Sequence, residues 1–81
     1  MIGLMWFDNS KDDLVTRVKR VVERYRMKSA EASVYAAAPN VCYVHAGQFA
    51  SVPATVDGIA VVETHDVLPN HFWVGVRNEG H

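Results

Sequence analysis

The sequence predicts an α+β domain of two layers, in which a mixed four-stranded sheet carries one main amphipathic helix on one face. Three observations lead to this prediction. Apolar residues between Leu14 and Tyr25 recur at helical spacing, and segments rich in β-branched and aromatic residues flank them on both sides. The length of 81 residues suffices for one hydrophobic core but not for two. We therefore expect residues 1–81 to form a single domain with the element order β-α-β-β-β.

The first strand and the helix after it are predicted from residue type and spacing. The segment Ile2 to Phe7 is rich in β-compatible residues and gives the first strand. Ser10 is a suitable N-cap, so we expect the helix to run from roughly Lys11 to Met27. The face that should pack on the sheet fills an arc of about 120° on a helical wheel and comprises Leu14, Val15, Val18, Val21, Val22 and Tyr25.

Residues 29–38 are rich in alanine, and the sequence leaves two structures open for them. Ser29 could cap a second short helix, or the first helix could continue into this segment. In either case Pro39 should end helical structure at Ala38, because a proline disfavours the helical conformation of the residue before it.

Three further strands are predicted in the second half of the chain. The segment Gly47 to Ser51 should form a turn with Phe49 as its apolar anchor, and Asp57-Gly58 is a typical turn sequence. We expect strands at Val41 to Val44 or His45, at Ile59 to Val67 or Leu68, and at His71 to Arg77.

The connections predict how these strands pair. The strand–helix–strand unit should place the first two strands parallel to each other. The last two strands should form an antiparallel hairpin. Its loop should lie around Leu68 to His71, because Pro69 cannot adopt the positive φ of a tight primed turn.

One helix covers only one face of such a sheet, so the other face is a candidate binding surface. Phe72 and Val74 should face the core, which directs Trp73 to the opposite side. Tyr43 and Trp6 lie on other strands, and the sequence does not fix the face of either. We predict that Trp6, Tyr43 and Trp73 contribute to an interface if they share the uncovered face.

The net charge of −1 conceals an uneven distribution of charged residues. Residues 11–28 hold seven of the eight lysines and arginines and three acidic residues, a local charge of +4, whereas the rest of the chain carries −5. A basic stripe beside the apolar arc spans about 80° of the wheel and comprises Arg17, Arg20, Arg24 and Lys28. It could follow nucleic-acid phosphates or dock on the acidic sheet of a second subunit. A solvated face whose arginines pair with acids is the more frequent explanation.

Residues with catalytic or metal-binding chemistry are few. Glu63, His65 and His71 are weak candidates for a site of two histidines and a carboxylate, because Glu63 and His65 share parity on one strand and His71 would lie across the hairpin. Their spacing matches no metal motif, and Cys42 should be a buried, inert thiol. We therefore expect no metal and no cofactor.

The small size of the chain predicts self-association. A domain of this length buries only about 60–65% of the surface of its unfolded chain, so its stability should be marginal. A single cysteine excludes an internal disulfide, which leaves a homo-oligomer as the expected source of additional stability. We expect a cytoplasmic protein, since no apolar run could span a membrane and the first seven residues do not resemble an export signal.

Several segments resemble a family of short, uncharacterised bacterial proteins. They are Met5 to Asn9, Pro39 to His45, Val56 to Ile59 and Val67 to Val76. The resemblance covers most of the chain and implies no activity, substrate or site residue.

The sequence therefore favours a non-enzymatic binding or assembly module that acts as a homo-oligomer, through its open sheet face or a strand edge. One alternative is a nucleic-acid-associated accessory protein that uses the basic stripe. A second alternative is a small metal-dependent or acid–base enzyme centred on Glu63, His65 and His71.

Overall fold

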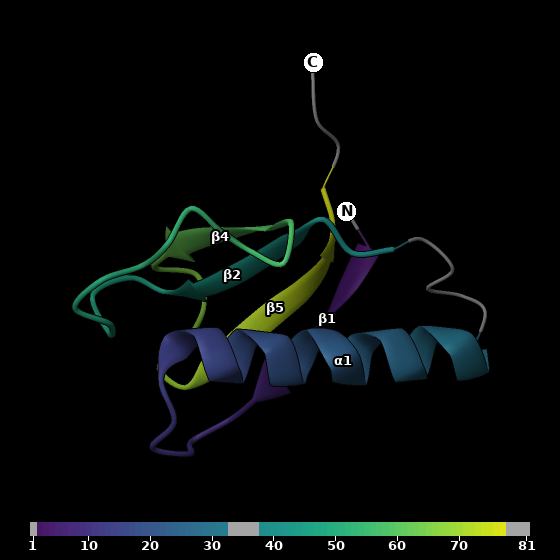
Figure 1. Ribbon diagram of the computed structural model, residues 1–81, viewed down its shortest axis with the longest axis horizontal. Coiled ribbons are helices and arrows are strands. Elements are labelled where there is room, and N and C mark those ends of the chain that lie inside the picture. The colour runs from purple at the N-terminus through teal and green to yellow at the C-terminus, as the bar shows by residue number, and fades with distance from the viewer. Residues whose placement is uncertain (1, 33–37, 78–81) are drawn as a thin grey trace.

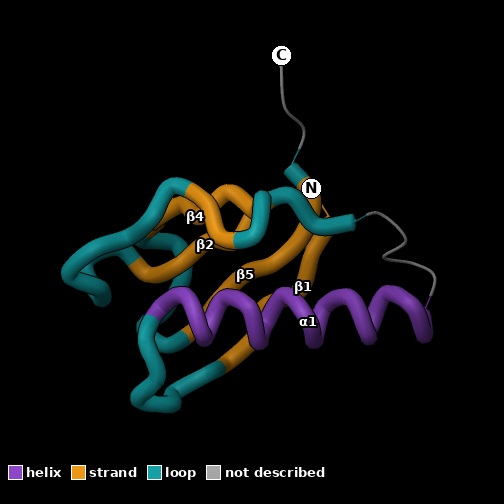
Figure 2. Tube along the Cα trace, viewed as in Figure 1, coloured by secondary structure: helices purple, strands orange, loops and turns teal. Residues whose placement is uncertain are grey.

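The computed structural model describes residues 2–32 and 38–77, which form one helix and a five-stranded mixed sheet (Figure 1). The helix lies along one side of the sheet (Figure 2), which confirms the predicted α+β class. The elements are β1 (Ile2–Phe7), α1 (Leu14–Ala32), β2 (Val41–His45), β3 (Thr55–Val56), β4 (Ile59–Thr64) and β5 (His71–Val76).

The sheet has five strands rather than the predicted four because the segment before the Asp57-Gly58 turn pairs with the segment after it. Strand β3 pairs with β4 in antiparallel fashion, with Val56 opposite Ile59. Asp57 and Gly58 have φ values of 50° and 81°, and a two-residue turn of type I′ requires positive φ at both positions. Glycine and aspartate tolerate this conformation, so the predicted turn is confirmed.

The order of the strands in the sheet is β1-β5-β2-β4-β3. Strands β1 and β2 are parallel, as predicted, but β5 lies between them and is antiparallel to both. The predicted hairpin of the last two strands is wrong, because β4 and β5 lie on opposite sides of β2. The loop that joins them passes the end of β2, where Val67 is buried and its carbonyl oxygen lies 2.6 Å from His45 Nδ1.

The interior position of β5 in the sheet follows from its side chains. Phe72 and Val74 are fully buried against the helix, and Gly75 is also buried. A strand that buries this much apolar surface is most stable where it has a neighbouring strand on each side and a helix over one face. In the predicted hairpin β5 would pair with β4, whereas in the structure it pairs with β1 on one side and β2 on the other.

Helix α1 begins at Leu14, later than predicted, and runs on to Ala32. Its N-cap is Asp13 rather than Ser10: the Asp13 carboxylate accepts a hydrogen bond of 2.9 Å from the Thr16 N–H. The first helix therefore continues into the alanine-rich segment as far as Ala32, which agrees with the second of the two alternatives that the sequence left open. Residues 33–37 lie outside the described part of the chain, so the remainder of that prediction stays open.

The core lies between α1 and the sheet. Five of the six predicted residues of the helix face are buried, whereas Val15 is 37% exposed. Fully burying a valine side chain contributes roughly 1.5–3 kcal/mol, so this packing outweighs the low helix propensity of the three buried valines in α1. Phe49 packs partly buried against this core, 6.2 Å from the ring of Phe72, which confirms its predicted role as an anchor. No helix in the described residues is long and apolar enough to cross a membrane.

Candidate binding surface

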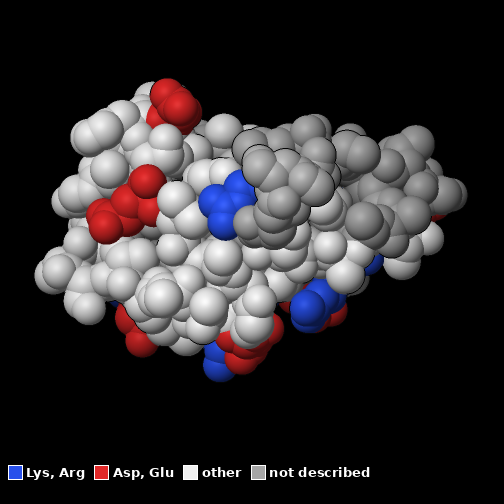
Figure 3. Space-filling view, turned by 90° about the horizontal axis from the view of Figure 1, so that it is seen from above, with Lys and Arg blue, Asp and Glu red and all other residues white. Residues whose placement is uncertain are grey.

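The face of the sheet that points away from α1, here called the open face, is defined by the strand register. Met5 lies opposite Trp73, Trp73 lies opposite Tyr43, and Tyr43 lies opposite Val62, so these four side chains form a row across four strands. Figure 3 views the molecule from the side away from α1, where most of the described surface is uncharged. The exposed fractions of Met5 and Phe7 are 49% and 54%, which is unusual for large apolar side chains on neighbouring positions of one face.

Tyr43 and Trp73 form the centre of the open face. Their ring centroids are 5.6 Å apart with the planes tilted by 55°, a favourable geometry for an aromatic pair. The guanidinium of Arg77 lies 5.9 Å from the centroid of the Tyr43 ring, and Arg77 Nη1 donates a hydrogen bond of 3.4 Å to the Tyr43 hydroxyl. The sequence left the face of Tyr43 open, and the structure places Tyr43 beside Trp73 on the open face.

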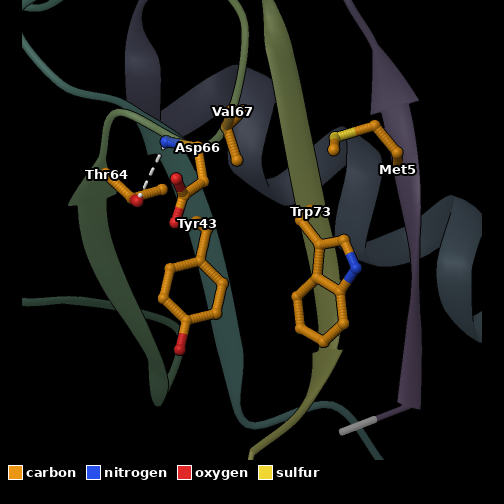
Figure 4. Close-up of a pocket in the computed structure, with 6 residues that line it drawn as sticks. All are labelled: Met5, Tyr43, Thr64, Asp66, Val67 and Trp73. Carbon is orange, nitrogen blue, oxygen red and sulfur yellow. Dashed lines mark hydrogen bonds between the residues drawn. The ribbon is translucent and has the colours of Figure 1, made fainter.

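A hollow of about 280 Å³ adjoins this aromatic pair (Figure 4). The Asp66 carboxylate is directed towards Tyr43, at the border of the hollow. The Thr64 hydroxyl accepts a hydrogen bond of 3.2 Å from the Asp66 N–H and so fixes the start of this loop. The lining residues are Met5, Tyr43, Thr64, Asp66, Val67 and Trp73.

Trp6 does not share the open face. Side chains alternate along β1, so Trp6 points to the helix side while Met5 and Phe7 point to the open side. The Trp6 ring packs against the core and borders a shallow groove with Arg24, Met27 and Lys28. Met5 and Phe7 therefore occupy the place on the open face that the sequence interpretation considered for Trp6. Only the strand register shows that Met5 and Phe7, and not Trp6, lie on the open face, and the sequence pattern does not contain this register.

Two members of the predicted basic stripe contact the protein itself. Arg20 forms an ion pair of 2.6 Å with the buried carboxylate of Asp8 and a second ion pair with Asp12. Arg17 is 9% exposed, donates to the backbone carbonyl of Asp12 at 2.7 Å and lies over the ring of Phe49. These contacts join α1 to the β1–α1 loop and to the core.

The other two members of the stripe lie further along the helix. Arg24 and Lys28 are exposed and border the groove beside Trp6. The four basic residues thus divide into a pair held in structural contacts and a pair at the surface, which shortens the continuous positive surface that a nucleic-acid backbone could contact.

The three weak metal candidates are not brought together. Strand β2 separates β4, which carries Glu63, from β5, which carries His71. Glu63 accepts a hydrogen bond of 3.2 Å from the Gly47 N–H, and His71 packs against Phe7 with 5.1 Å between ring centroids. His65 is exposed in the loop after β4. Among residues 2–32 and 38–77, no group of three histidine, cysteine or acidic side chains could hold a metal ion.

Cys42 lies on the core side of β2 and is fully buried. Burial raises the pKa of its thiol to about 12, because the charged thiolate is disfavoured in apolar surroundings. The thiol is therefore protonated at neutral pH, which agrees with the predicted inert role.

Comparison of the chain with protein-family models, with curated proteins and with solved structures finds no match. The function therefore has to be argued from the geometry of the surface itself.

Proposed function

We propose that the protein is a non-enzymatic binding and assembly module that forms a homodimer through the free edge of β1. The observation that carries this proposal is the composition of that edge. Strand β1 is six residues long and contains no charged residue and no proline, and no other described strand pairs with its outer side. Soluble proteins normally protect an edge strand with a charge, a proline, a bulge or a covering segment.

The other edge of the sheet provides a comparison within the same molecule. Strand β3 has only two residues, so it offers too few backbone groups for stable pairing with another chain. The two edges thus differ in length, and only β1 has the length of an ordinary interior strand. This asymmetry supports an isologous dimer, in which the β1 strands of two copies pair in antiparallel fashion around a two-fold axis.

The register identifies the backbone groups that would form such a pair. The Asp8 N–H donates to the carbonyl of Asn70 at 2.9 Å, in continuation of the β1–β5 register. Because hydrogen-bonded pairs alternate along an antiparallel ladder, the even-numbered residues of β1 direct their backbone groups to β5. The odd-numbered residues Gly3, Met5 and Phe7 direct theirs outwards.

An edge-to-edge dimer would leave the open face accessible and extend it. The two sheets would form one ten-stranded sheet, since each copy contributes the five strands of its own. With Met5 on the two-fold axis, the Met5 side chains of the two copies would lie opposite each other, and each Phe7 would lie opposite Gly3 of the other copy. This arrangement would cover part of the exposed apolar surface of Met5 and Phe7.

Two variants at one position test the proposal. Met5→Pro removes the outward N–H of the middle residue and leaves the hydrogen bonds to β5 in place. Met5→Ala removes most of the side chain but keeps the same N–H. Sedimentation velocity over a concentration series should show a dimer for the wild type and for Met5→Ala, and a monomer with unchanged circular dichroism for Met5→Pro.

The other outcomes have distinct meanings. A wild-type protein that stays monomeric at high concentration would contradict self-assembly as a whole. Loss of the dimer in both variants would place the interface on the open face instead of the edge. Leu68→Lys, which changes an exposed apolar side chain in the β4–β5 loop, serves as the control that should leave the dimer unchanged.

A further inference from the structure

The hollow on the open face combines two features that recognise positive charge. The rings of Tyr43 and Trp73 project side by side from β2 and β5 (Figure 4), and each ring presents the negative potential of a π-system. The carboxylate of Asp66 lies at the border of the same hollow. The remaining lining is apolar or uncharged, contributed by Met5, Thr64 and Val67.

One cation of the chain already lies beside this aromatic pair. The Arg77 guanidinium lies 5.9 Å from the centroid of Tyr43, although Arg77 itself does not line the hollow. The wider charge distribution also favours a cation. Most of the basic residues lie on α1, in the other layer of the domain, whereas β4 and the turns on either side of it carry Asp57, Glu63 and Asp66.

We propose that this hollow binds the methylated ammonium group of a lysine side chain on a partner protein. A methylated ammonium ion spreads its charge over several carbon atoms and is weakly hydrated, so it suits a hollow whose walls are mostly apolar and aromatic. An anionic ligand would be repelled by Asp66, and a neutral apolar ligand would leave that carboxylate partly desolvated without compensation. The hollow shares Met5 with β1, but its other lining residues lie in β2, β4, β5 and the β4–β5 loop, so it would be accessible in a monomer and in an edge-to-edge dimer.

The test is an NMR titration with two peptides of equal shape. One peptide carries trimethyllysine, and the other carries the neutral analogue in which a tert-butyl group replaces the trimethylammonium group. The chain has two tryptophans, and their indole N–H signals report on opposite sides of the sheet. We expect the trimethyllysine peptide to shift the Trp73 signal and leave the Trp6 signal in place, with the neutral peptide binding roughly two- to fivefold more weakly.

Two matched variants separate the hollow from the general charge of the protein. Asp66→Asn and Asp57→Asn each remove one exposed carboxylate, but only Asp66 lines the hollow. Binding of the charged peptide should weaken for Asp66→Asn and stay unchanged for Asp57→Asn, and added salt should weaken it in the wild type. Equal binding of the two peptides, a shift of Trp6 in place of Trp73, or equal effects of the two variants would overturn the proposal.

A monomeric wild type would refute the proposed dimer, but it would not contradict the proposed cation site. Conversely, a dimer that does not bind the trimethyllysine peptide would refute the cation site and leave the proposed dimer supported.

Discussion

The indole ring of Trp73 lies against the backbone of Gly3 on the neighbouring strand. A Cβ atom on Gly3 would collide with Cζ2 of Trp73 and would lie 2.6 Å from both Cη2 of that ring and the carbonyl oxygen of Val74. Real Cβ atoms do not approach this closely, and one of the obstructing atoms belongs to the backbone. The absence of a side chain at Gly3 therefore leaves room for the Trp73 ring, which forms one wall of the hollow.

We expect Gly3→Ala to destabilise the protein and to displace Trp73. Forcing one extra methyl group into a filled space typically costs about 1–3 kcal/mol of unfolding free energy. Denaturant unfolding measures this loss, and the indole N–H signal of Trp73 should shift in the same variant. Gly47→Ala is the control: its Cβ would meet open space, so it should leave the Trp73 signal unchanged, although its φ of 87° should cost about 1 kcal/mol.

The sequence sufficed to predict the main helix and four of the five strands because their patterns are local, whereas the two-residue strand β3 was missed. The core face of α1 and the bounds of β1 could be read from spacing and residue type alone. Ser10 is the predicted N-cap because it satisfies the local rule, but Asp13 satisfies the same rule and caps the helix in the structure. In the structure Ser10 is held by other partners: its N–H donates to Asp8, and its hydroxyl accepts from the Asp12 N–H and from Arg20.

The strand order and the composition of the surface could not be predicted in the same way. Nothing in the segment between β4 and β5 indicates that it passes β2, because the contact of His45 with the Val67 carbonyl joins residues that are distant in sequence. The same long-range register decides that Met5, and not Trp6, lies beside Trp73. A shift of the β1 register by one residue would place Trp6 on the open face and Met5 on the helix side. The alternation of side chains along a strand therefore defines two faces, but it does not show which face the helix covers.

The ion pair of Asp8 and Arg20 should make stability depend on pH in the acid range. Burial of Asp8 acts to raise its pKa, but hydrogen bonds from Ser10 and Arg20 together with the charge of Arg20 outweigh it and lower the pKa from 3.8 to about 2. A carboxyl group with a lowered folded pKa stabilises the folded protein above its unfolded pKa. That contribution is lost as the pH falls from about 4 to about 2.

We expect about 1–2 kcal/mol of unfolding free energy to disappear across this window. Denaturant unfolding at a series of pH values measures the loss. Asp8→Asn should be less stable at neutral pH and should show a smaller dependence on pH below 4. An identical pH profile for the variant and the wild type would show that Asp8 does not carry the effect.

Asn70 connects three segments of the domain and has a φ of 63°. Its side-chain oxygen accepts hydrogen bonds from Gln48 at 2.6 Å and from Arg17 at 3.3 Å, its N–H donates to Gln48, and its carbonyl accepts from the Asp8 N–H. An asparagine suits this place because it tolerates the left-handed conformation and carries an acceptor.

Two substitutions separate these two contributions. Asn70→Gly loses the side-chain acceptor but keeps an easy positive φ, so it should cost about 1–3 kcal/mol of unfolding free energy. Asn70→Ala loses the acceptor and also strains the backbone, so it should cost about 1 kcal/mol more than Asn70→Gly. Thermal and denaturant unfolding of both variants measure the difference. Equal stabilities would mean that the backbone relaxes away from the left-handed conformation when the side chain is removed.

The thiol of Cys42 should report on opening of the core. It is fully buried and its pKa is raised to about 12, so a thiol-specific disulfide reagent at neutral pH should react only through molecules that have opened. We expect labelling in native buffer to be slow and to accelerate with denaturant in parallel with global unfolding. Fully unfolded protein, the control, should release one equivalent of thiol per chain at once, because the sequence contains one cysteine. Rapid labelling in native buffer, with the circular dichroism unchanged, would instead show that the packing of α1 on β2 opens locally without global unfolding.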